Sequence, residues 1–207
     1  DTYNVAVGFN TGESITTGTH NTLVGGDAGD ALTVGNANVA VGFRALSGDT
    51  KGDRNVAIGY EALLNQNFTT STDSYNVAIG YVAGQSLTTG NSNVFIGGLC
   101  GDGTDDGNQN VAVGHNSLTG NTEANGNTAI GHNAMSASNT GNDNTGVGSG
   151  ALVSNTSGTG NVSVGAGIAG VDVAAMGSNT TGASNTAVGK NSLVANTTGG
   201  ENTAVGF

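Results

Sequence analysis

Three aspartates in the middle of the chain could bind a metal ion. Asp102, Asp105 and Asp106 lie among glycines in the segment 102–108. Carboxylate oxygens around a tight turn are ligands that Ca²⁺ prefers, so the segment is a candidate calcium site. It lacks the closing Glu of an EF-hand and the nonapeptide period of calcium-binding β-rolls. The alternative is that these aspartates form turns and keep the surface soluble.

Two histidines, His115 and His132, are 17 residues apart and form a second candidate metal or anion site. Imidazole nitrogens bind metal ions, although solvent-facing histidines are common. Five equivalent positions elsewhere in the chain carry an aromatic residue: Phe9, Phe43, Tyr60, Tyr81 and Phe207. Stacked coils would align these rings in a column, which would either pack as a ladder or bind sugars.

The sequence contains none of the common enzyme motifs. Gly-x-Ser-x-Gly, a phosphate-binding loop and Cys/His metal-ligand spacings are all missing. The single cysteine, Cys100, cannot form an intrachain disulfide. We therefore expect a protein that is not an enzyme and that needs no cofactor, with calcium as the one candidate ion.

The charge of the chain excludes two classes of partner. The net charge is −11, and only Arg44, Lys51, Arg54 and Lys190 are cationic. Binding to nucleic acid or to anionic membranes requires a basic patch, which these residues do not supply. No apolar run approaches the ~20 residues of a membrane span. We expect neither nucleic-acid binding nor membrane insertion.

The candidate residues are positioned by a repeat. The phrase Asn-[Val/Thr]-x-[Val/Ile]-Gly occurs twelve times, mostly at intervals of 17 residues. A fixed period this short indicates stacked coils of one repeat architecture. The phrase begins at Asn4, Asn21, Asn38, Asn55, Asn76, Asn93, Asn110, Asn127, Asn144, Asn161, Asn185 and Asn202.

Each position of the phrase suggests a structural role. The second and fourth residues are β-branched in all twelve copies, so they share one face of a short strand, which we expect to face the interior. The third residue is Ala in eight copies. This small residue predicts a second face that packs closely against other copies of the chain. The strand is then covered on both faces, as in buried parallel sheets.

The invariant Asn predicts a hydrogen-bonded ladder, because stacked coils place identical side chains ~4.8 Å apart. The glycine after each strand fits a turn that a Cβ would obstruct. One large apolar residue follows, eight or eleven residues after the Asn. We expect its side chain to fill the interior of the coil, and we call it the plug. The central members of the ladder are Asn38, Asn55, Asn76, Asn93, Asn110, Asn127 and Asn144.

Several copies of the phrase resemble a known family. Asn55-Val-Ala-Ile-Gly59, Asn127-Thr-Ala-Ile-Gly131 and Asn202-Thr-Ala-Val-Gly206 resemble the YadA-like head repeats of trimeric autotransporter adhesins, and equally the repeats of phage and viral tail-fibre proteins. The resemblance covers essentially the whole chain and implies a left-handed parallel β-roll in which three chains pack side by side. The adhesin repeat is nearer 14 residues, so a repeat of 17 departs from the family pattern.

Two insertions interrupt the period, near residues 65–75 and 166–184. Insertions in a solenoid form loops, and loops often carry binding residues. We therefore predict recognition loops in these two segments. The candidate recognition residues are Phe68, Asp73, Tyr75, Asp172 and Met176.

Together these patterns predict an all-β protein, a parallel β-solenoid of about 11–12 short coils that forms a single continuous domain over residues 1–207. We expect a segment of a longer trimeric extracellular fibre, on a virion tail or a cell surface, that supports attachment. Its expected partners are two further copies of the chain and a cell-surface glycan or protein receptor.

Two alternative functions remain open at this stage. Recurrent Thr before the second glycine of the repeat would suit an ice-binding solenoid, but Ser71, Asp105 and Asn139 interrupt the ranks and paired Thr-x-Thr columns are lacking. A polysaccharide-degrading tail spike would need a groove with acids and aromatics, and the chain has only four Tyr and five Phe. Separately, sequons at Asn67, Asn155, Asn161, Asn179 and Asn196 give no support for glycosylation, because a chain rich in Asn and Thr contains them by chance.

Overall fold

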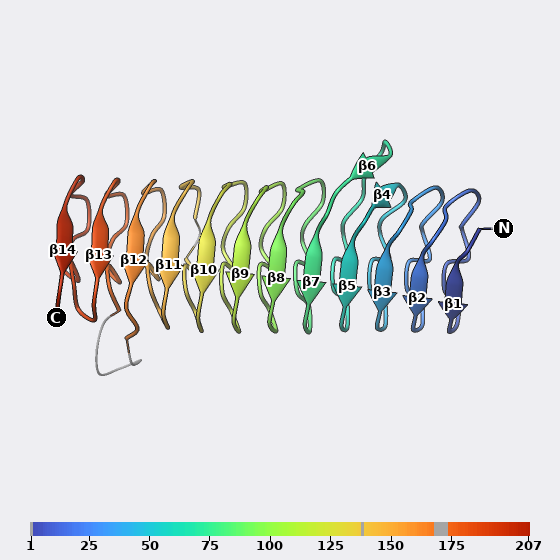
Figure 1. Cartoon of the computed structure of the whole chain (residues 1–207), viewed down its shortest axis with the longest axis horizontal. Coiled ribbons are helices and arrows are strands. Elements are labelled where there is room, and N and C mark those ends of the chain that lie inside the picture. The colour runs from blue at the N-terminus through green and yellow to red at the C-terminus, as the bar shows by residue number, and fades with distance from the viewer. Residues whose placement is uncertain (1, 138, 168–173) are drawn as a thin grey trace.

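The chain forms a row of stacked coils that runs from the N-terminus at one end to the C-terminus at the other (Figure 1). The computed structural model describes residues 2–137, 139–167 and 174–207. All regular structure in these ranges is β, which confirms the prediction of an all-β, parallel β-solenoid. A coil is named below by the Asn that begins its phrase.

Twelve strands form one parallel sheet along the row, in the order β1-β2-β3-β5-β7-β8-β9-β10-β11-β12-β13-β14. Each strand pairs with the equivalent residues of the next coil, so that Val39 lies opposite Val56. The repeat therefore fixes the register. The strands are β1 (Val5–Val7), β2 (Thr22–Val24), β3 (Val39–Val41), β5 (Val56–Ile58), β7 (Val77–Ile79), β8 (Val94–Ile96), β9 (Val111–Val113), β10 (Thr128–Ile130), β11 (Thr145–Val147), β12 (Val162–Val164), β13 (Thr186–Val188) and β14 (Thr203–Val205).

The sequence prediction for the two faces of the strand is wrong. The third residue of the phrase points into the coil: Ala57, Ala78 and Phe95 are all fully buried. The β-branched second and fourth residues point outward, and Ile79 and Ile96 keep 36% and 38% of their surface exposed. The reason is that the coil is thin. Its interior holds small strand side chains together with an aliphatic plug from the opposite wall.

The plug comes from one of two positions. In one coil type a Leu or Met eight residues after the Asn fills the interior, as Leu118 does in the Asn110 coil. In the other type that position is glycine and the plug lies three residues later, as with Gly84 and Leu87. The early position has a left-handed backbone in both types, with φ of 55° at Leu118 and 60° at Gly84. Leu and Met tolerate this conformation because the side chain is then buried.

The motif glycine is required by both its backbone and its neighbours. Gly80 has φ of 145°, a conformation that L side chains rarely adopt. A Cβ on Gly80 would also collide with the carbonyl oxygen of Gly97 in the next coil. The stacking of coils and the turn after each strand therefore exclude larger residues at this position.

The first insertion, residues 65–75, extends beyond the row of coils between β5 and β7 (Figure 1). It carries β6 (Thr72–Asp73), which pairs in parallel with β4 (Gly52–Asp53) from the coil before. This small second sheet ties the insertion to the body of the solenoid, so the insertion is an ordered element.

Candidate functional site

The motif asparagines are buried and connect the coils by hydrogen bonds. From Asn21 to Asn202, the backbone N–H of each motif Asn donates to the Oδ1 of the preceding one at 2.8–3.1 Å. In most coils Nδ2 also donates to a carbonyl in the last turn, as Asn110 does to Ala124 at 2.9 Å. The seven central asparagines named above have no exposed surface. Both ends of the amide are used, which leaves it no capacity for a ligand.

Two more polar ladders run beside this one, and neither was expected from the sequence. Two residues before the motif Asn, the Oδ1 of Asn125 accepts from the backbone N–H of Asn108 at 2.7 Å. The second of these ladders occurs in coils with an early plug. There a polar side chain in the last turn, eleven residues after the motif Asn in a regular coil, forms a hydrogen bond with the equivalent side chain of the neighbouring coil. One such bond runs from Asn196 Nδ2 to Asn179 Oδ1 at 3.0 Å. The Asn-x-Asn phrases, such as 108–110 and 125–127, are the sequence signal for the first of these ladders.

The candidate calcium ligands do not converge. Asp106 accepts hydrogen bonds from the hydroxyls of Thr88 and Thr89 at 2.7 and 2.6 Å, which lower the pKa of its carboxyl. Asp105 accepts from Thr88 at 2.8 Å. Burial raises the pKa of Asp102, whose Oδ1 has no hydrogen-bond partner. Within residues 2–137, 139–167 and 174–207, no group of three or more His, Cys, Asp or Glu residues could hold a metal ion. The segment therefore contains no cluster of ligands that would support the calcium hypothesis.

The two histidines stack on each other, and three of the five aromatic residues, Phe43, Tyr60 and Tyr81, form a second stack along the surface. The rings of His115 and His132 are 5.7 Å apart and nearly parallel. Phe43 stacks on Tyr60 at 5.6 Å, and Tyr60 stacks on Tyr81 at 5.4 Å. The faces of these rings are therefore partly covered by one another, and it is mainly the ring edges that meet solvent. Of the two alternatives raised by the sequence, this stacking corresponds to rings that pack on one another as a ladder.

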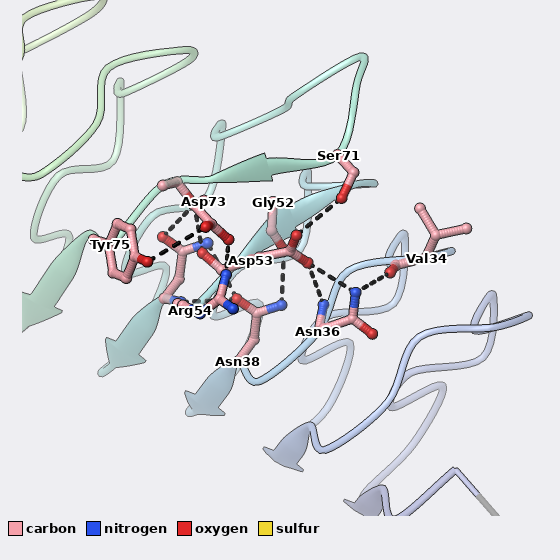
Figure 2. Close-up of polar contacts among 11 residues, drawn as sticks. Val34, Asn36, Asn38, Gly52, Asp53, Arg54, Ser71, Asp73 and Tyr75 are labelled. Atoms are coloured by element: carbon pink, nitrogen blue, oxygen red, sulfur yellow. Dashed lines mark hydrogen bonds and ion pairs between the residues drawn. The ribbon is translucent and has the colours of Figure 1, made fainter.

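The first insertion presents a braced polar surface, shown in Figure 2. Asp73 forms an ion pair with Arg54 and accepts from the Tyr75 hydroxyl at 3.3 Å. The Arg54 guanidinium lies 5.6 Å from the centre of the Tyr75 ring. Asp53 is buried beneath and accepts from Asn36 and from Ser71. Arg54, Asp73 and Tyr75 thus form an exposed group on a rigid support, which we call the insertion triad.

A buried carboxylate anchors the base of the insertion. Asp49 accepts from Gln66 Nε2 at 2.7 Å and from the backbone N–H groups of Lys51, Gly52 and Phe68 at 3.0–3.3 Å. Burial raises the pKa of this carboxyl, and the four hydrogen bonds counteract the shift. The polar chain continues from Gln66 Oε1, which accepts from Asn76 Nδ2 at 2.9 Å. Asp49 therefore joins the insertion to the ladders.

Two predicted recognition residues are in the interior, and the sequence prediction is wrong for both. Phe68 is only 6% exposed, because it folds inward over the base of the insertion. Met176 is fully buried, because it occupies the plug position of the Asn161 coil. Asp73 and Tyr75 are exposed, as a recognition residue must be. Asp172 lies outside the described residues.

The outward strand face is a continuous apolar surface along the solenoid. It consists of the second and fourth residues of every phrase, which form two parallel columns along the solenoid. Every residue in the fourth-position column is Val or Ile, and the second-position column contains Val and Thr. Side chains in the central coils are half-buried by their neighbours, and the rest of their surface faces solvent.

Comparisons with protein-family models, with curated proteins and with solved structures found no match. The described residues include no helix long and apolar enough to cross a membrane. The functional argument must therefore be made from the fold, the outward strand face and the insertion triad.

Proposed function

We propose that the chain is a structural and adhesive segment of a trimeric extracellular fibre, on a virion tail or a cell surface, that supports attachment to a host or other surface. The role is mechanical and recognitive, without catalysis. The observation that carries the proposal is the outward strand face: a row of β-branched side chains that extends over all twelve coils without interruption.

The area of this face supports self-association. Burial of an aliphatic side chain is worth ~1.5–3 kcal/mol at ~25 cal/mol per Å², which corresponds to roughly 100 Å² of surface. At the 36–39% exposure of Ile79, Ile96 and Ile130, each side chain leaves about 40 Å² uncovered. The two columns contain nineteen Val and Ile side chains, which together leave on the order of 760 Å².

A patch of this size is larger than a soluble monomer usually exposes, which is about 300–600 Å². It matches the area of about 800 Å² that each partner buries in a standard protein interface. Further copies of the chain suit this face because a second solenoid has the same coil spacing. Two straight rows of side chains can then interdigitate along their whole length. The trimeric state itself is carried by the family resemblance.

Light scattering on the purified chain tests the assembly. We expect a mass three times the chain mass of 20.0 kDa. Lysines at Ile79 and Ile96 would place charges on the outward strand face, so the I79K/I96K variant should dissociate while its circular dichroism spectrum stays unchanged. The control T181K/T198K adds the same two charges at exposed sites away from the strands and should leave the mass unchanged. A well-folded monomer of the unmodified chain would refute the trimer.

The insertion triad is the proposed recognition surface for a glycan or protein receptor. Tyr and Arg are the residue types that most often dominate binding energy, and the contacts within the triad hold both side chains in place. An array of cell-surface glycans provides the probe. Tyr75→Ser should abolish the signal of any glycan retained, whereas Tyr81→Ser removes an equally exposed tyrosine from the strand side and should not. Equal losses, or no glycan retained, would contradict recognition of glycans by the triad.

A further inference from the structure

We propose that Asn67, in the first insertion, is an acceptor for N-linked sugar, and that it is the one sequon of this chain that the folded protein can present. The phrase Asn67-Phe68-Thr69 is one of five Asn-x-Ser/Thr sequons. The sequence alone does not distinguish among them, but the hydrogen bonds and exposure of the five asparagines do.

Four of the five acceptor amides are already committed to the ladders. In each, Nδ2 donates two hydrogen bonds of 2.8–3.1 Å, one to an Asn of the preceding coil and one to a glycine carbonyl. Three of these side chains are fully buried and the fourth is partly buried. Attachment of a sugar would break both bonds and push the coils apart. These four residues are Asn155, Asn161, Asn179 and Asn196.

Asn67 differs in each respect. Its side chain is exposed, and its Nδ2 donates no hydrogen bond within the described chain. Its Oδ1 shares the one hydrogen of the Thr50 hydroxyl with the Phe68 carbonyl, each at 3.0 Å. Thr69, which supplies the hydroxyl that defines a sequon, is exposed as well. The acceptor nitrogen and the sequon hydroxyl are thus both available on the folded surface.

The local fold keeps the sequon in this orientation. Phe68 between the two polar residues is buried, and its carbonyl accepts from Thr50 Oγ1 at 3.0 Å. The Thr69 carbonyl accepts from Lys51 Nζ at 3.0 Å. The buried ring anchors the segment, and the residues on either side of it point outward. A sugar on Asn67 would extend from the insertion and would displace no ladder contact.

The chemistry is a substitution at the anomeric carbon of an activated sugar. With a nucleotide sugar as donor, Nδ2 of Asn67 forms a bond to C1, and the bond from C1 to the diphosphate oxygen breaks. The nucleoside diphosphate leaves with the electron pair of that bond, and a base of the transferase takes the amide proton. The protein supplies only the acceptor, so the proposal is independent of the trimeric fibre proposed above.

The folded full-length chain is incubated with a soluble sequon-specific N-glycosyltransferase and UDP-glucose, and the product is analysed by intact mass and peptide mapping. We expect one hexose per chain, on Asn67. Asn67→Gln should abolish the modification, and so should Thr69→Ala, which leaves the asparagine exposed but destroys the sequon. Peptides that carry each of the five sequons, treated in parallel, show which ones the enzyme can modify when no fold protects them.

Two results would overturn the proposal. One is a folded chain that stays unmodified although the Asn67 peptide accepts glucose. The other is modification of the folded chain at Asn155, Asn161, Asn179 or Asn196 as readily as at Asn67. In either case, exposure and free hydrogen-bonding capacity would not determine which sequon is used.

Discussion

Substitution of Phe95 and Gly101 together should convert the Asn93 coil, whose interior is filled by a strand Phe, into a coil with an early plug. Most coils have Ala at the inward strand position, but the Asn93 coil has Phe95 there and Gly101 at the early plug position. A Cβ on Gly101 would lie 2.5 Å from Phe95 Cδ1. The ring therefore fills the space that a plug occupies elsewhere. The double variant F95A/G101L gives the Asn93 coil the same pair of residue types that the Asn110 coil has at the equivalent positions, Ala112 and Leu118.

The expected free-energy changes are strongly non-additive. Phe95→Ala alone leaves a cavity and should cost about 3–5 kcal/mol of unfolding free energy. Gly101→Leu alone forces a side chain into the ring and should cost at least about 1–3 kcal/mol by overpacking. In the double variant the Leu fills the cavity, so that the loss should stay within about 1–2 kcal/mol, the scale of a volume-conserving exchange. The two sites should therefore show a coupling energy of at least about 2 kcal/mol.

Urea unfolding followed by circular dichroism measures these changes. All variants must be compared at one chain concentration, because self-association makes the apparent stability concentration-dependent. The left-handed backbone at Gly101, with φ of 61°, is close to the 55° at Leu118, so the backbone can accept the leucine. If the losses of the single variants add up in the double variant to within about 0.5 kcal/mol, the plug argument is refuted.

Two further predictions concern the polar interior. Asn110→Ala leaves the Asn127 N–H unpaired in the core and removes one of the two hydrogen bonds to the Ala124 carbonyl, which keeps its bond from Asn121, so urea unfolding should show a loss of about 1–3 kcal/mol. The exposed Asn65→Ala should change stability by less than about 0.5 kcal/mol, and a comparable loss there would contradict the ladder's role. Burial raises the pKa of Asp49 above its ordinary 3.8, so the folded state binds its proton more tightly than the unfolded state. The unmodified chain should therefore gain stability relative to Asp49→Asn as the pH falls from neutral towards 3.8, and a pH-independent difference would contradict this.

The period of the phrase was sufficient to predict the coils, the parallel sheet and its register, because identical residues one repeat apart must lie side by side. The direction of the strand faces was not predicted correctly. Hydrophobic alternation identifies which residues share a face but not which face is inside. The Asn held the missing information. It is two residues before the Ala of the phrase, so a buried Asn and a buried Ala must occupy the same face, as Asn55 and Ala57 do.

The candidate sites show a different limit of sequence reasoning. Asp102, Asp105 and Asp106 are close in sequence, but only Asp105 and Asp106 share a partner, the Thr88 hydroxyl, and within the described residues no third ligand joins them. Met176 was assigned to a loop because it lies within residues 166–184, where the second insertion interrupts the period. Its neighbour Ala175 completes an Ala-Met pair that matches Ala134-Met135 of a regular coil, and that match identifies a plug. The network around Asp49 and the insertion triad depends on contacts between coils, which no local pattern in the sequence contains.

The inverted faces change what kind of molecule this is. With β-branched residues inside, the chain would be a self-sufficient solenoid with a small-residue contact strip. With Ala inside, the core of one coil is thin, and the more apolar side chains line the surface. In the proposed fibre, stability and assembly would be linked, because the outward strand face would be buried between chains. This arrangement is compatible with the proposed recognition and modification sites on the first insertion. It extends from the row of coils on its own small sheet, so a ligand or a sugar there leaves the outward strand face free to pack.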